Sequence, residues 1–221
     1  MDIGEIRPSS SNGDSYILVA IDYFAKWVEA KAYKNITQSE VIEFLRSSLI
    51  YRFGIAQNVV VDNAIVFNGS LIKDFAAEFG FVLTNSSPYY AQSNGQAELT
   101  NKIIKNAVQK MIDDNPRSWH TLLLDVLWAL RVTKRESIEQ TPCNLVYGHD
   151  AILLIEVRHK SRRFLAHQEN NHIDYEESMY IELENLDAVH QIRKSLNRIQ
   201  VQKERAARSY NKRVVLKSFK K

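Results

Sequence analysis

Three acidic residues, Asp2, Asp62 and Glu98, have side chains of the type that binds divalent metal ions. Asp2 lies in the first predicted strand, Asp62 ends the apolar run NVVVD (58–62), and Glu98 lies in the first turn of a predicted helix. Two divalent ions about 3.5–4 Å apart need several hard oxygen ligands, and Mg²⁺ takes the rest of its shell from water and substrate phosphate. One ion would activate an attacking water or 3′-hydroxyl group, and the other would stabilise the leaving oxygen. Acids of these types could therefore support phosphoryl-transfer chemistry, although each of them taken alone is more often a turn former or a helix cap.

Polar residues that follow Glu98 are candidate contacts to a nucleic-acid phosphate. On a helix, Lys102 and Lys105 lie at i+4 and i+7 from Glu98 and share one face with it, and Asn101 lies at i+3 on the same side. A Lys beside a metal-binding acid can hold a DNA phosphate near the ions. The alternative is a Glu–Lys surface pair that stabilises the helix by roughly a few tenths of a kcal/mol.

The loop before Glu98, SSPYYAQSNG (86–95), leaves two interpretations open. Tyr90, Gln92 and Asn94, with their neighbour Tyr89, either contact DNA ends by stacking and hydrogen bonding or pack the loop itself. An isolated Asp at a strand end is more often a turn former or a helix cap than a metal ligand. We therefore interpret Asp22, which ends the second predicted strand, as structural.

Short strands and helices alternate along the first part of the chain. Thr37 and Glu40 form a capping box that begins a helix, and Gly54 ends this helix. The predicted strands are 1–6, 15–22, 27–33, 58–62 and 81–84, and the other predicted helices are 70–79, 95–113 and 118–134. This order predicts a mixed α/β sheet with helices packed on it. Residues 141–148 are interpreted as irregular, and Trp27, Trp119 and Trp128 as core or interface residues.

The C-terminal part of the chain has a different character. Apolar residues recur at coiled-coil steps between 175 and 199, which predicts a long helix. Residues 1–157 carry a net charge of −4, whereas 158–221 carry +7. A basic tail on a mildly acidic body indicates a polyanionic partner such as nucleic acid, and the equal alternative is a solvated end.

Several classes of protein are excluded by what the sequence lacks. No run approaches the roughly 18 apolar residues that a membrane span needs, and no signal peptide is recognised at the N-terminus. A single cysteine, Cys143, excludes an internal disulfide framework. The scattered histidines give no Cys/His zinc module, so we expect neither a membrane nor zinc as a partner.

The sequence around the acids resembles the integrase core of retroviruses and LTR retrotransposons, in which 35 residues separate the second and third catalytic acids, as they separate Asp62 and Glu98. VDNAIVF (61–67) matches the strand-end motif of this family, and SPYYAQSNGQAELTNK (87–102) matches the loop and helix with the final Glu. Four further segments resemble the gypsy-type retrotransposon version of this core: DYFAKWVEA (22–30), RFGI (52–55), TPCNLVYG (141–148) and ARSYNKRV (207–214). The resemblance covers nearly the whole chain.

This resemblance implies a ribonuclease-H-like α/β fold, with a mixed five-stranded sheet flanked by helices and followed by a long C-terminal helical extension. It places an integrase catalytic core at 1–157 and a helical, basic extension at 158–221. It implies a polynucleotidyl transferase that uses Mg²⁺ or Mn²⁺, held by Asp2, Asp62 and Glu98, to cleave element DNA ends and join them to target DNA. A homo-oligomer and a nuclear location follow from the same resemblance and from DNA as the substrate.

Two departures from the family motifs predict local consequences. Ala64 stands where the family has Gly, and if that position needs a positive φ, Ala costs about 1–2 kcal/mol. The segment MDIGEI (1–6) is one residue shorter than the usual Asp-x-Ile-Gly motif, and such a deletion turns side chains to the other face of a strand unless a bulge absorbs it. One alternative is therefore a catalytically weakened fragment that retains DNA binding and self-association. Another is a ribonuclease-H-like nuclease, which the spacing of the acids disfavours.

Overall fold

The computed structural model describes residues 1–86, 95–111, 115–161 and 164–165, together with 194, 197–198, 201, 204–205 and 208. These residues form two compact units, Met1–Arg131 and Val132–Lys221, and each is described by itself. The predicted helix over 175–199 and the loop 87–94 lie almost wholly outside the described residues. The boundary between a core and an extension at 157 stays a prediction.

The strands of the first unit form two sheets. Strands β1 (Asp2–Glu5), β2 (Tyr16–Ile21) and β3 (Val28–Tyr33) pair antiparallel in the order β1-β2-β3. Strands β4 (Asn58–Val61) and β5 (Val82–Asn85) form a separate parallel pair. All five predicted strands are present, but the single five-stranded sheet is replaced by a three-stranded and a two-stranded sheet.

A backbone contact brings the two sheets together at the site of interest. The amino nitrogen of Met1 donates a hydrogen bond to Val60 O, so the start of β1 lies beside the end of β4. Asp2 directly follows Met1, and Asp62 lies two residues after Val60, so this contact brings the two carboxyl-bearing residues to one place. The adjacency that a continuous sheet would supply is therefore kept by this contact.

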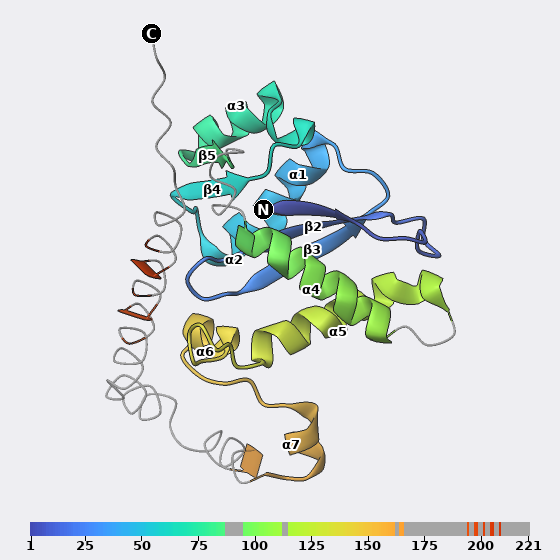
Figure 1. The fold of residues 1–221 in the computed structure, drawn as a ribbon, viewed down its shortest axis with the longest axis vertical. Coiled ribbons are helices and arrows are strands. Elements are labelled where there is room, and N and C mark those ends of the chain that lie inside the picture. The colour runs from blue at the N-terminus through green and yellow to red at the C-terminus, as the bar shows by residue number, and fades with distance from the viewer. Residues whose placement is uncertain are drawn as a thin grey trace. The chain divides into compact units, whose positions relative to one another are not determined.

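Alternation along β2 divides the apolar residues into two layers, as a period of two requires. Leu18 and Ala20 join a core with α1 (Gln38–Phe44) and α3 (Ser70–Phe79). Ile17 and Val19 join a second core with α4 (Gly95–Met111) and α5 (Trp119–Val132). The first unit is a helix–sheet–helix sandwich, and Figure 1 shows α4 lying across the three-stranded sheet.

Helix boundaries in the first unit follow local capping chemistry. The Glu40 carboxylate accepts a hydrogen bond from the backbone nitrogen of Thr37 at 2.9 Å, which confirms the predicted start of α1. The helix continues through a π-helical turn (Leu45–Ile50) and α2 (Tyr51–Phe53), and it ends at Gly54 with φ of 85°. Gly80 ends α3 in the left-handed conformation, directly after the predicted helix over 70–79.

The second unit corrects the interpretation of residues 141–148 as irregular. They form α6 (Pro142–Tyr147), in which Thr141 Oγ1 accepts a hydrogen bond from Asn144 N at 3.0 Å and Gly148 ends the helix with φ of 82°. The sequence contains three signals of this helix that the prediction did not use: a Thr cap, a Pro at the first helical position and a Gly after the last helical residue. Helix α7 (Leu154–Arg158) follows.

The tryptophans separate into two groups. Trp119 is fully buried and Trp27 is 7% exposed, which confirms them as core residues. Trp128 is 45% exposed and is not a core residue, so its interface role stays a prediction. In the part of the chain that the structure describes, no helix combines the length and the apolar character that crossing a bilayer requires.

Candidate metal and nucleic-acid site

The first two predicted acids lie next to each other. Asp2, at the start of β1, is 9% exposed, and Asp62 follows β4 in a half-buried position. Burial raises the pKa of the Asp62 carboxyl, and the Asp2 carboxyl raises it further through its charge and a hydrogen bond. The Asp2 contribution needs the two carboxyl groups to be close, which agrees with the backbone contact between Met1 and Val60, so β1 presents Asp2 toward Asp62. The reversal of strand faces that a one-residue deletion would cause is therefore not found.

The turn after β4 holds the Asp62 side chain. Ala64 N donates a hydrogen bond to Asp62 Oδ1 at 3.0 Å, and Asn63 Nδ2 donates to Ser86 O at 2.8 Å. Ala64 has φ of −60° and ψ of 142°, an extended conformation that any residue adopts. The expected penalty for Ala in place of Gly is thus absent, because this position needs no positive φ.

Replacing Ala64 with Gly therefore tests whether the turn is relaxed. We expect Ala64→Gly to lower the free energy of unfolding by about 0.4–1 kcal/mol, because Gly increases the entropy of the unfolded chain and gains nothing in the folded one. Urea denaturation of the two chains measures this difference. An increase in stability would show that Ala64 is strained.

Helix α4 brings the predicted residues that lie on it to a pocket beside Asp2. Its apolar stripe packs on β1 and β2 and buries Ala97, Thr100, Asn101, Ile104 and Val108. The row of residues next to this stripe carries Glu98, Lys102 and Lys105. An open pocket of about 270 Å³ is lined by Asp2, Ile3, Glu98, Asn101, Lys102, Lys105, Asn106 and Gln109.

Asn101 is the residue of α4 in direct contact with a predicted acid. Its side chain is 4% exposed, and Asn101 Nδ2 donates a hydrogen bond to Asp2 Oδ2 at 2.7 Å. Asn101 was predicted to contact DNA, and that contact stays a prediction. Lys102 is exposed and Lys105 is partly buried at the rim of the pocket, whereas Tyr90, Gln92 and Asn94 lie outside the described residues.

Of the three candidate metal ligands, Asp2 is the one that lies near both of the others. It adjoins Asp62 on one side and lines the pocket with Glu98 on the other. Within the described ranges, no three His, Cys, Asp or Glu side chains lie close enough together to hold an ion, so the complete set of three stays a prediction. Two crowded, partly buried carboxyl groups are nonetheless hard oxygen donors that suit a divalent cation. The residues present fit such a metal.

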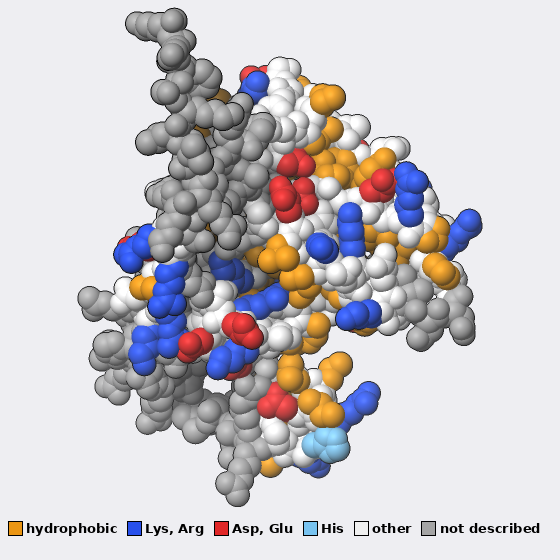
Figure 2. All heavy atoms as spheres, in the orientation of Figure 1, with side chains coloured by type: hydrophobic (Ala, Val, Ile, Leu, Met, Phe, Trp, Pro, Cys, Tyr) orange, Lys and Arg blue, Asp and Glu red, His pale blue; other side chains and the backbone are white. Residues whose placement is uncertain are grey.

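Charge is distributed around the pocket in a way that suits a phosphate. Figure 2 shows acidic side chains gathered near the start of β1 and α4, with basic side chains on the same face.

Asp22 has the structural role that was predicted, since its Oδ1 accepts a hydrogen bond from Phe24 N at 3.0 Å in the turn after β2. In the same turn, Lys26 Nζ donates to Gln96 Oε1 at 3.0 Å and links the turn to the start of α4.

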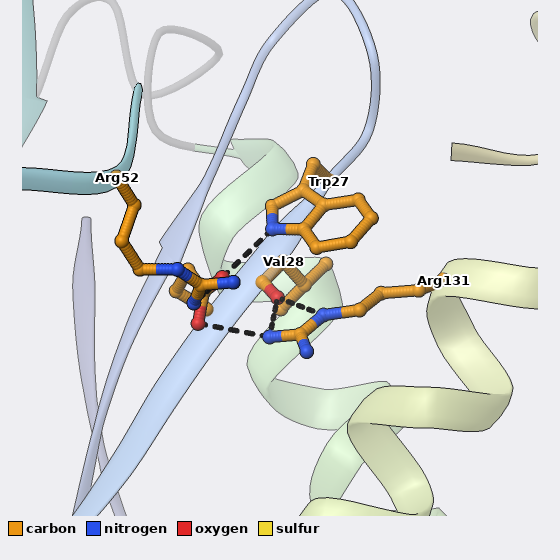
Figure 3. Close-up of polar contacts among 5 residues, drawn as sticks. Trp27, Val28, Arg52 and Arg131 are labelled. Carbon is orange, nitrogen blue, oxygen red and sulfur yellow. Dashed lines mark hydrogen bonds and ion pairs between the residues drawn. The ribbon is translucent and has the colours of Figure 1, made fainter. Parts of the chain in front are cut away.

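Sequence reasoning missed Glu29, a buried acid on β3 that is 6% exposed. Its carboxylate accepts hydrogen bonds from Trp27 Nε1 at 2.8 Å and from an Arg131 guanidinium nitrogen at 2.8 Å, and it pairs with Arg52. Arg131 also donates to Val28 O at 2.8 and 3.0 Å. Figure 3 shows Arg52 of α2 and Arg131 of α5 reaching toward one point on β3 from opposite sides. This group ties two helices to the sheet that carries Asp2.

Gly4 is a second residue that sequence reasoning missed. A Cβ atom at Gly4 would lie 2.1 Å from Asn101 Oδ1, so α4 approaches β1 at this point more closely than any side chain allows. A single Gly inside a strand pattern is a recognised signal of close backbone approach, and this signal was present in the sequence.

Comparisons with known proteins bear on the ancestry and the fold of the chain. No protein-family model matches the chain. The Tf2-3 and Tf2-4 transposon polyproteins of Schizosaccharomyces pombe are each 27% identical to it over 154 residues, which is 69% of this chain and 12% of each polyprotein. The chain thus matches only a small part of these relatives' length.

Two solved structures share its fold. One is an intasome of simian T-cell lymphotropic virus in complex with PP2A regulatory subunit B56 gamma, with a TM-score of 0.58 and 23% identity over 69% of this chain and 54% of that one. The other is the HTLV-2 integrase catalytic core domain in complex with magnesium (trimeric form), with a TM-score of 0.53 and 20% identity over 65% of this chain and 92% of that one. The chain is homologous to the Tf2 retrotransposon polyproteins and has the ribonuclease-H-like α/β fold of retroviral integrase catalytic cores.

Proposed function

We propose that this chain is the catalytic core of a retrotransposon integrase, a polynucleotidyl transferase that cleaves element DNA ends and joins them to target DNA. One observation carries the proposal. Asp2 and Asp62, 60 residues apart in the sequence, meet at the join of two sheets, beside a pocket lined by Glu98, Lys102 and Lys105. Homology to transposon polyproteins and the integrase-core fold support the same function.

The proposed metal ligands are Asp2, Asp62 and Glu98, with Mg²⁺ or Mn²⁺ as the cofactor. A bound divalent ion lowers the pKa of water or a hydroxyl group and stabilises negative charge on phosphate oxygens. The magnesium complex of the HTLV-2 core supports this choice of cation. The protein's own contribution is to fix Asp2 on a strand, Asp62 in a hydrogen-bonded turn and Glu98 on the first turn of α4.

The proposed DNA contacts lie along α4 and the loop before it. Lys102 and Lys105 stand one turn and two turns after Glu98, so a phosphate at the pocket meets positive charge on the same face as the acids. Tyr90, Gln92 and Asn94 are proposed contacts to DNA ends. We further propose that the protein acts in the nucleus as a homo-oligomer, which the intasome and trimeric forms of its structural relatives support.

A strand-transfer assay tests this function. We expect the 221-residue chain to join a labelled element-end duplex to a target plasmid when Mg²⁺ or Mn²⁺ is supplied, and to stop when EDTA is added. DNA binding without joining at any metal concentration would contradict the proposal and favour a weakened fragment that only binds DNA. Hydrolysis of an RNA·DNA hybrid without joining would indicate a different nuclease.

The basic face of α4 gives a second testable prediction. We expect Lys102→Ala/Lys105→Ala to weaken DNA binding and to reduce the slope of log K against log [salt] by about 1–2, because each lysine that contacts a phosphate releases about one counterion. Fluorescence anisotropy at several salt concentrations measures both quantities.

The matched control is Lys73→Ala, which removes an exposed lysine from α3, away from the pocket. It should leave the salt slope within error of the parent chain. Equal slopes for the double variant and the parent would remove these lysines from the interface.

A further inference from the structure

The side-chain amide of Asn101 lies between the backbone of β1 and the first acid. Asn101 Nδ2 donates to Asp2 Oδ2 at 2.7 Å, and this hydrogen bond is buried. The other end of the amide packs against Gly4, where a Cβ atom would lie 2.1 Å from Oδ1 and 2.5 Å from Nδ2. The Asn101 side chain of helix α4 is therefore in contact with strand β1 at both Asp2 and Gly4.

The unpaired half of this amide shows which contact determines its orientation. Asn101 Oδ1 is buried and has no hydrogen-bond partner among the described residues. If the side-chain amide were rotated by 180°, Oδ1 would face the Asp2 carboxylate. Two hydrogen-bond acceptors would then oppose each other, which is unfavourable. Leaving a carbonyl oxygen buried and unpaired is unfavourable, so the contact of Nδ2 with Asp2 is what holds the amide in place.

Gly4 provides the room that this arrangement needs. Gly4 pairs with Ile17 in a regular antiparallel ladder, so its role is not to supply an unusual backbone conformation. Any side chain at position 4 would displace the Asn101 amide by more than an ångström, and the displaced amide would lose Asp2. Gly4 and Asn101 thus depend on each other, although 96 residues separate them in the sequence.

We propose that Asn101 and Gly4 form a positioning pair that fixes the orientation of the Asp2 carboxylate. Asn101 acts through Asp2, and Gly4 acts through Asn101. A carboxylate with one oxygen held by a buried donor keeps a single rotamer, which keeps it directed at the Asp62 side of the site. This inference rests on the proposed function, because it assigns the pair to the metal site suggested for Asp2, Asp62 and Glu98.

Mn²⁺ affinity of the full chain provides the first test. Asn101→Leu keeps the approximate size of the side chain and removes the donor, so we expect the Kd for Mn²⁺ to rise at least about ten-fold. Asn35→Leu is the matched control, because it makes the same change at an exposed position before α1 that does not line the pocket. Its Kd should equal that of the parent chain. Circular dichroism checks that each variant is folded.

A mutant cycle separates positioning from general packing. Gly4→Ala should weaken Mn²⁺ binding by a similar factor in the parent chain. In an Asn101→Ala background, where no amide remains to be displaced, Gly4→Ala should have no further effect. Equal and additive losses in both backgrounds would show that Gly4 acts independently of Asn101 and would overturn the pairing.

A measurement without metal separates this inference from the proposed function. The side-chain ¹³C resonance of the Asp2 carboxyl should move in Asn101→Leu and not in Asn35→Leu. If the parent chain binds no Mn²⁺, the proposed metal site is wrong, and this resonance alone decides whether Asn101 orients Asp2. If the parent chain binds Mn²⁺ but neither its Kd nor the resonance changes in Asn101→Leu, the positioning role is wrong and the metal site stands.

Discussion

Replacing Glu98 with Gln is expected to lower Mg²⁺-dependent strand transfer by at least about 10²–10³-fold, with little change in folding. Glu98 is exposed on the first turn of α4, so its substitution removes no core contact. Gln keeps the size of the side chain and removes the negative charge, which the proposed metal site needs. Single-turnover joining of a labelled duplex measures the rate.

A matched control identifies the cause of that loss. Glu78→Gln makes the same change at an exposed position on α3 and should leave the joining rate unchanged. DNA affinity should not fall in Glu98→Gln, because removing a negative charge from a DNA-binding face does not weaken its attraction to phosphate. A Glu98→Gln chain that joins DNA at the parent rate would remove Glu98 from the catalytic site.

The second large effect concerns stability. We expect Glu29→Ala to lower the free energy of unfolding by about 3–5 kcal/mol, because removing one member of a buried ion pair leaves its partners uncompensated. Arg131 has a side chain that is only 16% exposed, and it would lose its carboxylate partner. Trp27 Nε1 would lose its acceptor in a buried setting. Urea denaturation monitored by tryptophan fluorescence measures the difference.

Two further variants show where this stability comes from. Glu29→Gln keeps an acceptor for Trp27 Nε1 and loses the charge, so its free energy of unfolding should lie between those of the parent chain and Glu29→Ala. Glu43→Ala breaks the exposed pair with Lys31, whose side chains are 47% and 59% exposed, and should change stability by no more than about 0.5 kcal/mol. Similar losses for Glu29→Ala and Glu43→Ala would mean that the buried group contributes no special stability.

Local signals made most of the first unit predictable. The Thr37–Glu40 capping box and the glycines at 54 and 80 placed helix ends correctly, because each acts within one turn of the chain. The apolar run over 15–22 predicted a strand, and β2 is buried on both faces. The pairing of strands was harder, because a pattern of residues indicates which face is apolar and does not say which strand lies beside which. The single five-stranded sheet was implied by the family resemblance, and the structure has a three-stranded and a two-stranded sheet instead.

The site was predictable to a different extent for each residue. Asp62 and Glu98 stand out through their spacing and motifs, and Asp2 was predicted despite its short motif. The partners of these acids were not predicted, because Asn101 and Gly4 are polar and small residues whose meaning depends on a helix crossing a strand. Glu29 was missed for the same reason, since its partners Arg52 and Arg131 lie 23 and 102 residues away.

A crystal structure with Mn²⁺ tests the central claim most directly, because anomalous scattering locates the ion independently of the protein model. We predict an anomalous peak within coordination distance, about 2.0–2.3 Å, of carboxylate oxygens of both Asp2 and Asp62, with Glu98 completing the set. A peak bound elsewhere, or a Glu98 carboxylate directed away from an ion held by the other two acids, would contradict the proposed three-acid site.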